Sequence, residues 1–271
     1  MFPFERLAVV YFALFGAGAL LTMPGRPRPW RAILCAGASV VGVIAIASMG
    51  SITVRAWLPH GYLVVGYWLP ALLVGTVSSS AFEAWLVRTD ARIRQHLLPL
   101  PRWATDVAEL SYLMCYPAVP AAFILVWTRG NLVDVERFWV SVLAAGFACY
   151  GNLPWLPSRP PRLLEGSGVS NYARGAHDTG TEHASHALAV INTAVLTRVS
   201  HQLNTFPSGH VAVAVAAALS AMTVWWPAGL ALAVVAVGIA VGAVAGRYHY
   251  AVDVLLGVVV GLGAVVLFAV F

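Results

Sequence analysis

The sequence predicts an all-α, polytopic membrane protein, a transmembrane helical bundle of about eight spans. Hydrophobic residues make up 60% of the 271 residues, charged residues make up only 10%, and the mean hydropathy is +0.79. Soluble domains carry about 25% charged residues, so this chain lacks the polar side chains that cover a water-facing surface. Its apolar stretches approach 20 residues without period-two alternation, which favours spanning helices. The composition excludes a soluble globular domain, a disordered chain and a nucleic-acid-binding module.

Eight apolar segments are the predicted spans. They lie at about 7–23, 32–50, 62–82, 107–127, 138–156, 208–226, 228–246 and 251–271. We expect the first to be a retained span, because no signal-peptide cleavage site follows it. Between the third and fourth spans, residues 83–103 alternate Arg88, Arg92 and Arg94 with apolar side chains such as Trp85. This pattern predicts an amphipathic helix that lies at the membrane interface.

The connection between the fifth and sixth spans, 157–206, is long, polar and rich in Pro, Gly, His and Arg. Long loops in compact proteins are usually functional or disordered, and we favour function because 187–199 is typical of a short interfacial helix. A zinc site is an alternative here, since several side chains have suitable spacing. They are His177, Asp178, Glu182, His183 and His186. No Cys accompanies them and no second H-x3-H pair follows, so we expect no metal.

The last three predicted spans carry the sharpest functional pattern. They contain only two formally charged residues, Arg247 and Asp253, and two histidines, His210 and His249. Ionisable groups at membrane depth are costly, so function is their default interpretation. His249 and Asp253 are four residues apart, which places them on one face of a helix that begins near Tyr250. The carboxylate would then orient the imidazole and leave its other nitrogen basic, as an activated nucleophile requires.

A second element, Asn204-Thr-Phe-Pro-Ser-Gly-His210, stands at the start of the sixth span. Pro207 suits the first turn of a helix, and Gly209 lets the backbone come close to a ligand. The free N–H groups of that turn, together with the Ser208 hydroxyl, would form an anion site. His210 lies beside this site as a proton donor.

A third element follows the fifth span, where Arg162 and Arg159 offer planar guanidinium donors suited to phosphate oxygens. The fifth and sixth spans open on the same membrane side as the seventh and eighth. We therefore expect the three elements to converge on one face of the membrane.

These residues resemble the type 2 phosphatidic acid phosphatase superfamily, or lipid phosphate phosphatases, whose signature has three parts. The P-S-G-H part is complete at 207–210. The S-R-x5-H-x3-D part keeps His249 and Asp253, whereas Gly242 and Ala243 stand at its S-R pair. Arg247 resembles the substitute in the branch that is similar to inositol phosphotransferases.

The K-x6-R-P part is degenerate, because Asn152 stands at the position of its Lys, seven residues before Arg159. The pattern that ends at Arg162, Pro157-x-x-Pro-Pro-Arg, resembles the version in that same branch. The resemblance implies a six-helix core over 61–271, with an active-site loop at 157–206, and it makes 1–60 two additional N-terminal transmembrane helices.

The resemblance also implies hydrolysis of a lipid phosphomonoester or diphosphate without metal or other cofactor. His249 would form a phosphohistidine, Asp253 would orient it, and His210 would protonate the leaving oxygen. The substrate phosphate would be held by Arg162, Arg247, Ser208, Gly209 and Arg159.

Two alternatives stay open, and the composition argues against a third. A phosphotransferase similar to inositol phosphorylceramide synthases would use the same residues and pass a phospho-headgroup to a lipid alcohol. A non-catalytic lipid-binding protein or transporter is disfavoured because the charges cluster at one membrane face. A vanadate haloperoxidase shares the motifs but is soluble.

Two considerations disagree on which side of the cell membrane the active site faces. The short connections on its side carry Arg26, Arg28, Arg31, Arg88, Arg92, Arg94 and Arg102. The opposite connections carry Arg6, Arg55, Arg129 and Arg137. The positive-inside rule therefore favours the cytoplasm. The family resemblance implies an extracytoplasmic site, which we prefer because the Arg side chains near 83–104 suit lipid phosphates of the outer leaflet.

Overall fold

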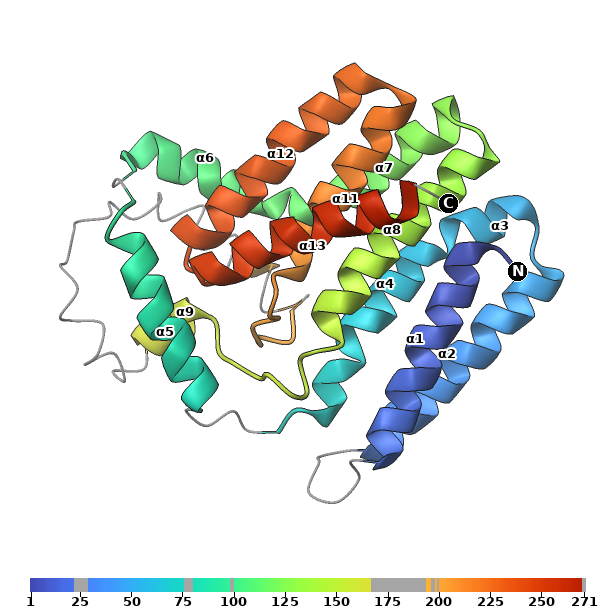
Figure 1. Ribbon diagram of the computed structural model, residues 1–271, viewed down its shortest axis with the longest axis horizontal. Helices are drawn as coiled ribbons and strands as arrows, with labels where there is room; N and C mark the ends of the chain where they lie inside the picture. Colours follow the sequence, from blue (N-terminus) through green and yellow to red (C-terminus); the bar gives the residue numbers. More distant parts are fainter. Residues whose placement is uncertain are drawn as a thin grey trace.

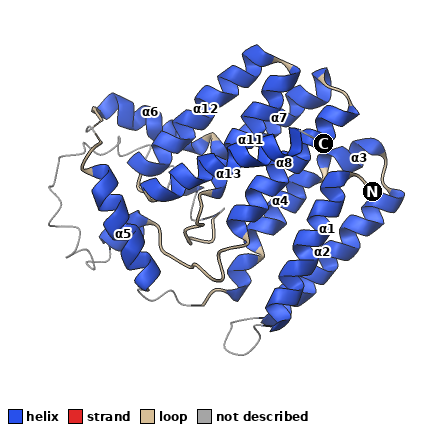
Figure 2. Cartoon of the chain, viewed as in Figure 1, coloured by secondary structure: helices blue, strands red, loops and turns tan. Residues whose placement is uncertain are grey.

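The computed structural model describes residues 1–21, 29–75, 80–97, 100–166, 194–195, 198 and 200–269, and it is helical, as the sequence predicts (Figure 2). Its main helices are α1 (Pro3–Leu21), α2 (Pro29–Met49), α3 (Ile52–Trp57), α4 (Pro59–Trp68), η1 (Pro70–Leu73), α5 (Ala81–Arg94), α6 (Arg102–Leu113), α7 (Cys115–Arg129), α8 (Leu132–Tyr150), α9 (Pro161–Gly166), α11 (Gly209–Val224), α12 (Trp226–Ala245) and α13 (Ala251–Ala269). No strand occurs in the described residues, where Ser158 and Asn204 form an isolated antiparallel bridge.

Among the described residues, four helices, α1, α2, α12 and α13, are long and apolar enough to span a membrane, and the bent pair α6–α7 makes a fifth candidate. These helices are compatible with a multi-pass membrane protein. The predicted count of eight spans is not confirmed. α11 has only 16 residues, and α8 carries three charged side chains near its start. The predicted third span, 62–82, ends early, because α4 stops at Trp68 and η1 at Leu73.

The predicted span 107–127 is two helices that meet at 58°. α6 ends at Leu113 and α7 begins at Cys115, with Pro117 in its first turn. A proline ring clashes with the carbonyl four residues before it, which here belongs to Leu113. The proline therefore explains why one apolar stretch becomes two helices.

The predicted interfacial helix at 83–103 forms over a shorter range, as α5. Trp85 is exposed on its outer face, whereas Glu83, Leu86 and Asp90 are buried on its inner face. In Figure 1, α5 lies at one edge of the molecule, and it packs against α13. Two acidic side chains therefore point from this helix into the protein.

α11 lies at the centre of the bundle and packs against α7, α8, α12 and α13 (Figure 1). Its small side chains are buried almost all round, as expected of a helix without a polar face. Two glycines of α13 bring its backbone against α11. A Cβ atom at Gly257 would meet the carbonyl oxygen of Ser208 at 2.6 Å, and one at Gly261 would meet that of Ala212 at 2.6 Å. This contact sets the two helix starts side by side.

α1 and α2 pair at the edge of the bundle, beside α4 and α8 (Figure 1). Tyr11 stacks on Phe147 of α8, with ring centroids 3.9 Å apart, and donates a hydrogen bond to the carbonyl of Gly66 in α4. Near the N-terminus, buried Glu5 forms an ion pair of 2.7 Å with Arg55 of α3. These contacts join the N-terminal helices to the rest of the bundle.

Candidate active site

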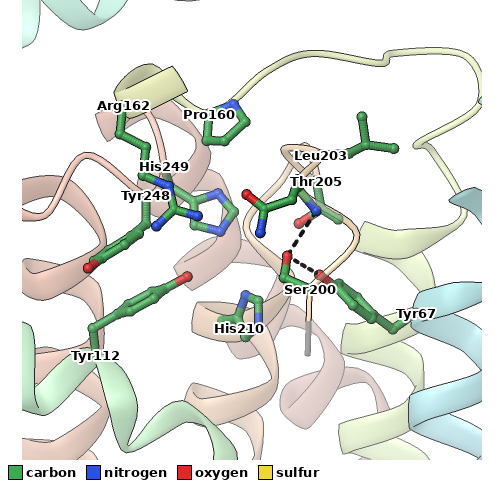
Figure 3. A pocket seen from close by; sticks show the side chains of 11 residues that line it. Tyr67, Tyr112, Pro160, Arg162, Ser200, Leu203, Thr205, His210, Tyr248 and His249 are labelled. Carbon is green, nitrogen blue, oxygen red and sulfur yellow. Dashed lines mark hydrogen bonds between the residues drawn. The ribbon is translucent and has the colours of Figure 1, made fainter. Parts of the chain in front are cut away.

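A small pocket opens where α11 starts, in front of the turn that precedes α13 (Figure 3). Its walls come from α4, α6, the start of α9, the loop at 200–205 and that turn. The lining residues are Tyr67, Tyr112, Pro160, Arg162, Ser200, Gln202, Leu203, Thr205, His210, Tyr248 and His249. The structure thus brings together one residue or more from each of the three sequence elements.

His210 and His249 face each other in this pocket, with ring centroids 6.0 Å apart (Figure 3). His210 is the second residue of α11. His249 lies just before α13, which begins at Ala251, close to the predicted start near Tyr250, and its N–H donates to the carbonyl of Ala243. The Nδ1 atoms of both rings are buried without a hydrogen-bond partner.

Asp253, in the first turn of α13, is fully buried behind His249. Its Oδ2 lies 3.6 Å from Nδ1 of His249, which is beyond hydrogen-bond distance, although such contacts are often long before substrate binds. Oδ2 also accepts 2.8 Å from Nδ2 of Asn204 and 3.2 Å from the N–H of Tyr250. The carboxylate is therefore held in place independently of the imidazole.

Arg162 reaches the pocket from the start of α9 (Figure 3). Its guanidinium carbon lies 4.7 Å from the ring centroid of Tyr248, and its Nε is buried without a partner. Tyr248 stacks on Tyr112 at 4.1 Å and donates a hydrogen bond of 2.6 Å to buried Glu109. The aromatic stack supports the one arginine among the lining residues, by cation–π attraction.

The other two arginines of the predicted phosphate site do not line the pocket. Arg159 binds Glu83 of α5 through both its guanidinium, at 2.7 Å, and its backbone N–H, at 3.0 Å. The Glu83 carboxylate raises the pKa of Arg159. Arg247 pairs with Asp90 of α5 at 2.7 Å. Both guanidinium groups thus bind the inner face of one helix.

Ser208 is the N-cap of α11, and its fully buried Oγ has no hydrogen-bond partner. Pro207 precedes this cap, so it is not inside the first helical turn as the sequence suggests. Gly209 is required by close packing, because a Cβ atom there would overlap the ring of Tyr150. The start of α11 is therefore held tightly against α8.

Sequence reasoning missed several side chains that build the site. Asn204 donates from Nδ2 to both Asp253 and Ser158, which joins the three sequence elements. Tyr67 bonds to Ser200 at 3.0 Å and stacks on His201 at 4.2 Å. Asn204 belongs to the second element, and the available signal was a polar amide side chain at the start of that element. Tyr67 gives no signal in the sequence, because α4 is far from the motifs along the chain.

The potential zinc ligands His177, Asp178, Glu182, His183 and His186 lie outside the described residues, as does most of 187–199. Within the part of the chain that the structure describes, no group of three or more His, Cys, Asp or Glu side chains could hold a metal ion.

A family model for the PAP2 superfamily matches residues 80–267, from the N-cap of α5 to near the end of α13. Comparisons with curated proteins and with solved structures gave no match. The matched region contains every motif on which the resemblance rests, and it leaves α1 to α4 outside. The resemblance to type 2 phosphatidic acid phosphatases is confirmed: this chain belongs to the PAP2 superfamily.

Proposed function

We propose that this protein is an integral-membrane phosphatase that hydrolyses a phosphomonoester or diphosphate of a lipid. Membership of the PAP2 superfamily supports phosphatase-type activity on phosphate esters. The lipid substrate is our inference from the apolar helices around the site. The observation that carries the proposal is the pair His210 and His249, which face each other across a pocket that also holds Arg162.

In the first step, Nε2 of His249 attacks phosphorus while the bond from phosphorus to the lipid oxygen breaks. His210 donates a proton to that leaving oxygen, so the lipid departs as an alcohol or a phosphate. Asp253 lies behind Nδ1 of His249, where it stabilises the positive charge that the ring acquires. The product of this step is a phosphohistidine.

In the second step, His210 takes a proton from water, whose oxygen attacks phosphorus. The bond between phosphorus and Nε2 breaks, and inorganic phosphate leaves. Arg162 would stabilise the phosphoryl oxygens, which is the main task in phosphoryl transfer, and the buried Ser208 and Gly209 would hold His210 in place at the start of α11. His210 donates and takes back the proton of the two steps, and Arg162 supplies positive charge for the phosphoryl oxygens, so the proposed reaction uses no metal.

The test is phosphate release by the purified protein in detergent from phosphatidate, phosphatidylglycerol phosphate, polyprenyl phosphate and polyprenyl diphosphate. We expect turnover of at least one of them. Transfer of the phospho-group to an added lipid alcohol, without free phosphate, would instead identify a phosphotransferase. No reaction with any substrate would favour the non-catalytic alternative.

We further propose that the site faces the extracytoplasmic side of the cell membrane. His249 precedes α13, whose 19 residues extend about 28 Å at 1.5 Å per residue, so the end of α13 at Ala269 lies near the opposite face. A reporter fused after Phe271 should therefore be active in the cytoplasm. Activity of that reporter only in the periplasm would place the chemistry inside the cell.

A further inference from the structure

The inner face of α5 carries two buried carboxylates, Glu83 and Asp90, which are seven residues apart and hence on one side of the helix. The Asp90 side chain is 4% exposed. Its Oδ2 pairs with Nη1 of Arg247 at 2.7 Å, and its Oδ1 accepts 2.8 Å from the backbone N–H of Ala251. One carboxylate of a neighbouring helix therefore uses both of its oxygens on the segment that contains His249.

The two partners of Asp90 flank the nucleophile. Arg247 stands two residues before His249, and Ala251 stands two residues after it. Arg247 has φ 59°, a left-handed conformation that costs energy for a residue with a Cβ atom. Ala251 begins α13, where a carboxylate on a free N–H is favourable. Asp90 thus fixes both ends of a five-residue turn whose middle residue is His249.

The same contact extends to the phosphate-binding side of the pocket. The backbone N–H of Arg162 donates 3.1 Å to the carbonyl of Arg247. This contact uses the main-chain carbonyl of Arg247 and not its side chain, so Arg247→Gln would keep the acceptor for Arg162. Arg247 itself does not line the pocket, and its side chain is 18% exposed.

We propose that Asp90 is a positioning residue for His249, and that Arg247 is its ion-pair partner and not a phosphate ligand. This inference rests on the proposed function, because it assigns a role to the site that carries it. Glu83 of α5 makes a similar ion pair with Arg159. α5 therefore binds two of the motif segments, although it belongs to neither motif. Phosphate binding is left to Arg162, the one predicted phosphate ligand that lines the pocket.

The experiment compares Asp90→Asn, Arg247→Gln and the double variant with the wild-type protein. The amide in Asp90→Asn would keep an oxygen for the N–H of Ala251 but lose the charge that Arg247 needs. We expect kcat to fall about 10- to 100-fold in each single variant, since a misplacement near 1 Å costs about that much. KM and the inhibition constant for vanadate should stay within about threefold, and the double variant should be no slower than the slower single variant.

A matched control is the ion pair between Glu5 and Arg55, which has the same 2.7 Å distance and comparable burial but lies near the N-terminus. Glu5→Gln and Arg55→Gln should lower the melting temperature without changing kcat. This comparison separates loss of a buried charge pair, which is destabilising anywhere, from loss of catalytic geometry.

The outcomes are distinct. A kcat near the wild-type value in Asp90→Asn, or a more than tenfold rise of the vanadate constant in Arg247→Gln, would overturn the proposal. Multiplicative losses in the double variant would do the same. If Asp90→Asn is not recovered folded, the vanadate constant of Arg247→Gln decides alone. Inactivity of the wild-type protein on every lipid phosphate counts against the proposed function. If the wild-type protein is active and the variants keep its kcat, the result counts against the Asp90 inference only.

Discussion

Asn204 donates a hydrogen bond of 2.8 Å from its amide nitrogen to Oδ2 of Asp253, 49 residues away along the chain. The same nitrogen donates 3.0 Å to Oγ of Ser158. A single buried amide therefore connects the segment after α8, the loop before α11 and the start of α13. Both of its N–H groups are used, so its orientation is fixed by its partners.

Replacement of Asn204 by Asp should lower kcat by about 10- to 100-fold, because a second carboxylate would face Asp253 where a donor is required. Asn204→Ala should have a smaller effect, since it removes the hydrogen bonds without adding charge. Turnover on the best lipid phosphate measures both. Asn131, the N-cap of α8, is a matched control: Asn131→Ala should cost about 1 kcal/mol of stability and leave kcat unchanged. Equal activity of Asn204→Asp and wild type would contradict this role.

The variants His249→Ala and His210→Ala should each lower kcat by a factor of about 10³ or more, because nucleophile and acid act as one unit. The double variant should be no worse than either single variant. Melting temperatures in detergent check that the proteins are folded. Near-wild-type phosphate release by either variant would remove that histidine from the mechanism.

Activity should survive chelation by EDTA, because His and Arg side chains suffice to handle the phosphate. Orthovanadate should inhibit competitively by occupying the same pocket. Phosphate release measured with and without each reagent tests both expectations. Loss of activity with EDTA that zinc restores would instead assign a role to His177, His183 and His186.

Gly257→Leu should lower both stability and kcat, because any Cβ atom there meets the carbonyl of Ser208 at 2.6 Å. Overpacking of this kind costs about 1–3 kcal/mol. Gly263, on the same helix, has no atom within 4 Å of an added Cβ, so Gly263→Ala should leave kcat unchanged. Thermal unfolding and turnover of the two variants give the comparison. Similar behaviour of both would show that the close helix contact is not critical.

Acidification should destabilise the protein in part through His201. Burial lowers the pKa of His201 to about 4, below its usual value of 6.5, so the unfolded chain binds more protons between these values. Stability therefore rises with pH across that window and is lost as pH falls below about 6.5, by at most about 3 kcal/mol. His201→Phe, which keeps a ring against Tyr67, should flatten the decrease in melting temperature from pH 7 to pH 5. An unchanged pH dependence would contradict this source.

The helical class and the convergence of the motif segments follow from local features of the sequence. The long apolar stretches indicate the helical class, and the places of the motifs at the ends of these stretches indicate that the motif segments converge. The partners of the two arginines do not follow, because Arg159 and Arg247 each have the chemistry of a phosphate ligand and also of an ion pair. Only the three-dimensional position of α5 distinguishes these possibilities, through Glu83 and Asp90.

The pocket wall formed by Tyr67 shows another limit. α4 lies outside the region that the family model matches, and its residues are separated from the motifs by about a hundred positions. The break between α6 and α7 was readable in principle from Pro117, yet hydropathy alone treats 107–127 as continuous. Contacts between distant segments, unlike helix breaks, have no counterpart in a single sequence.

The glycine contact between α13 and α11 makes the starts of these two helices a rigid unit. The position of His210 relative to the start of α13 is then determined by closely packed backbones, and His249 lies in the turn that leads directly into α13. Any movement that admits a bulky lipid headgroup must come from the facing walls, the 200–205 loop and the aromatic side chains of α4 and α6. Changes in those walls can alter which molecule enters, while His210 stays fixed relative to the start of α13.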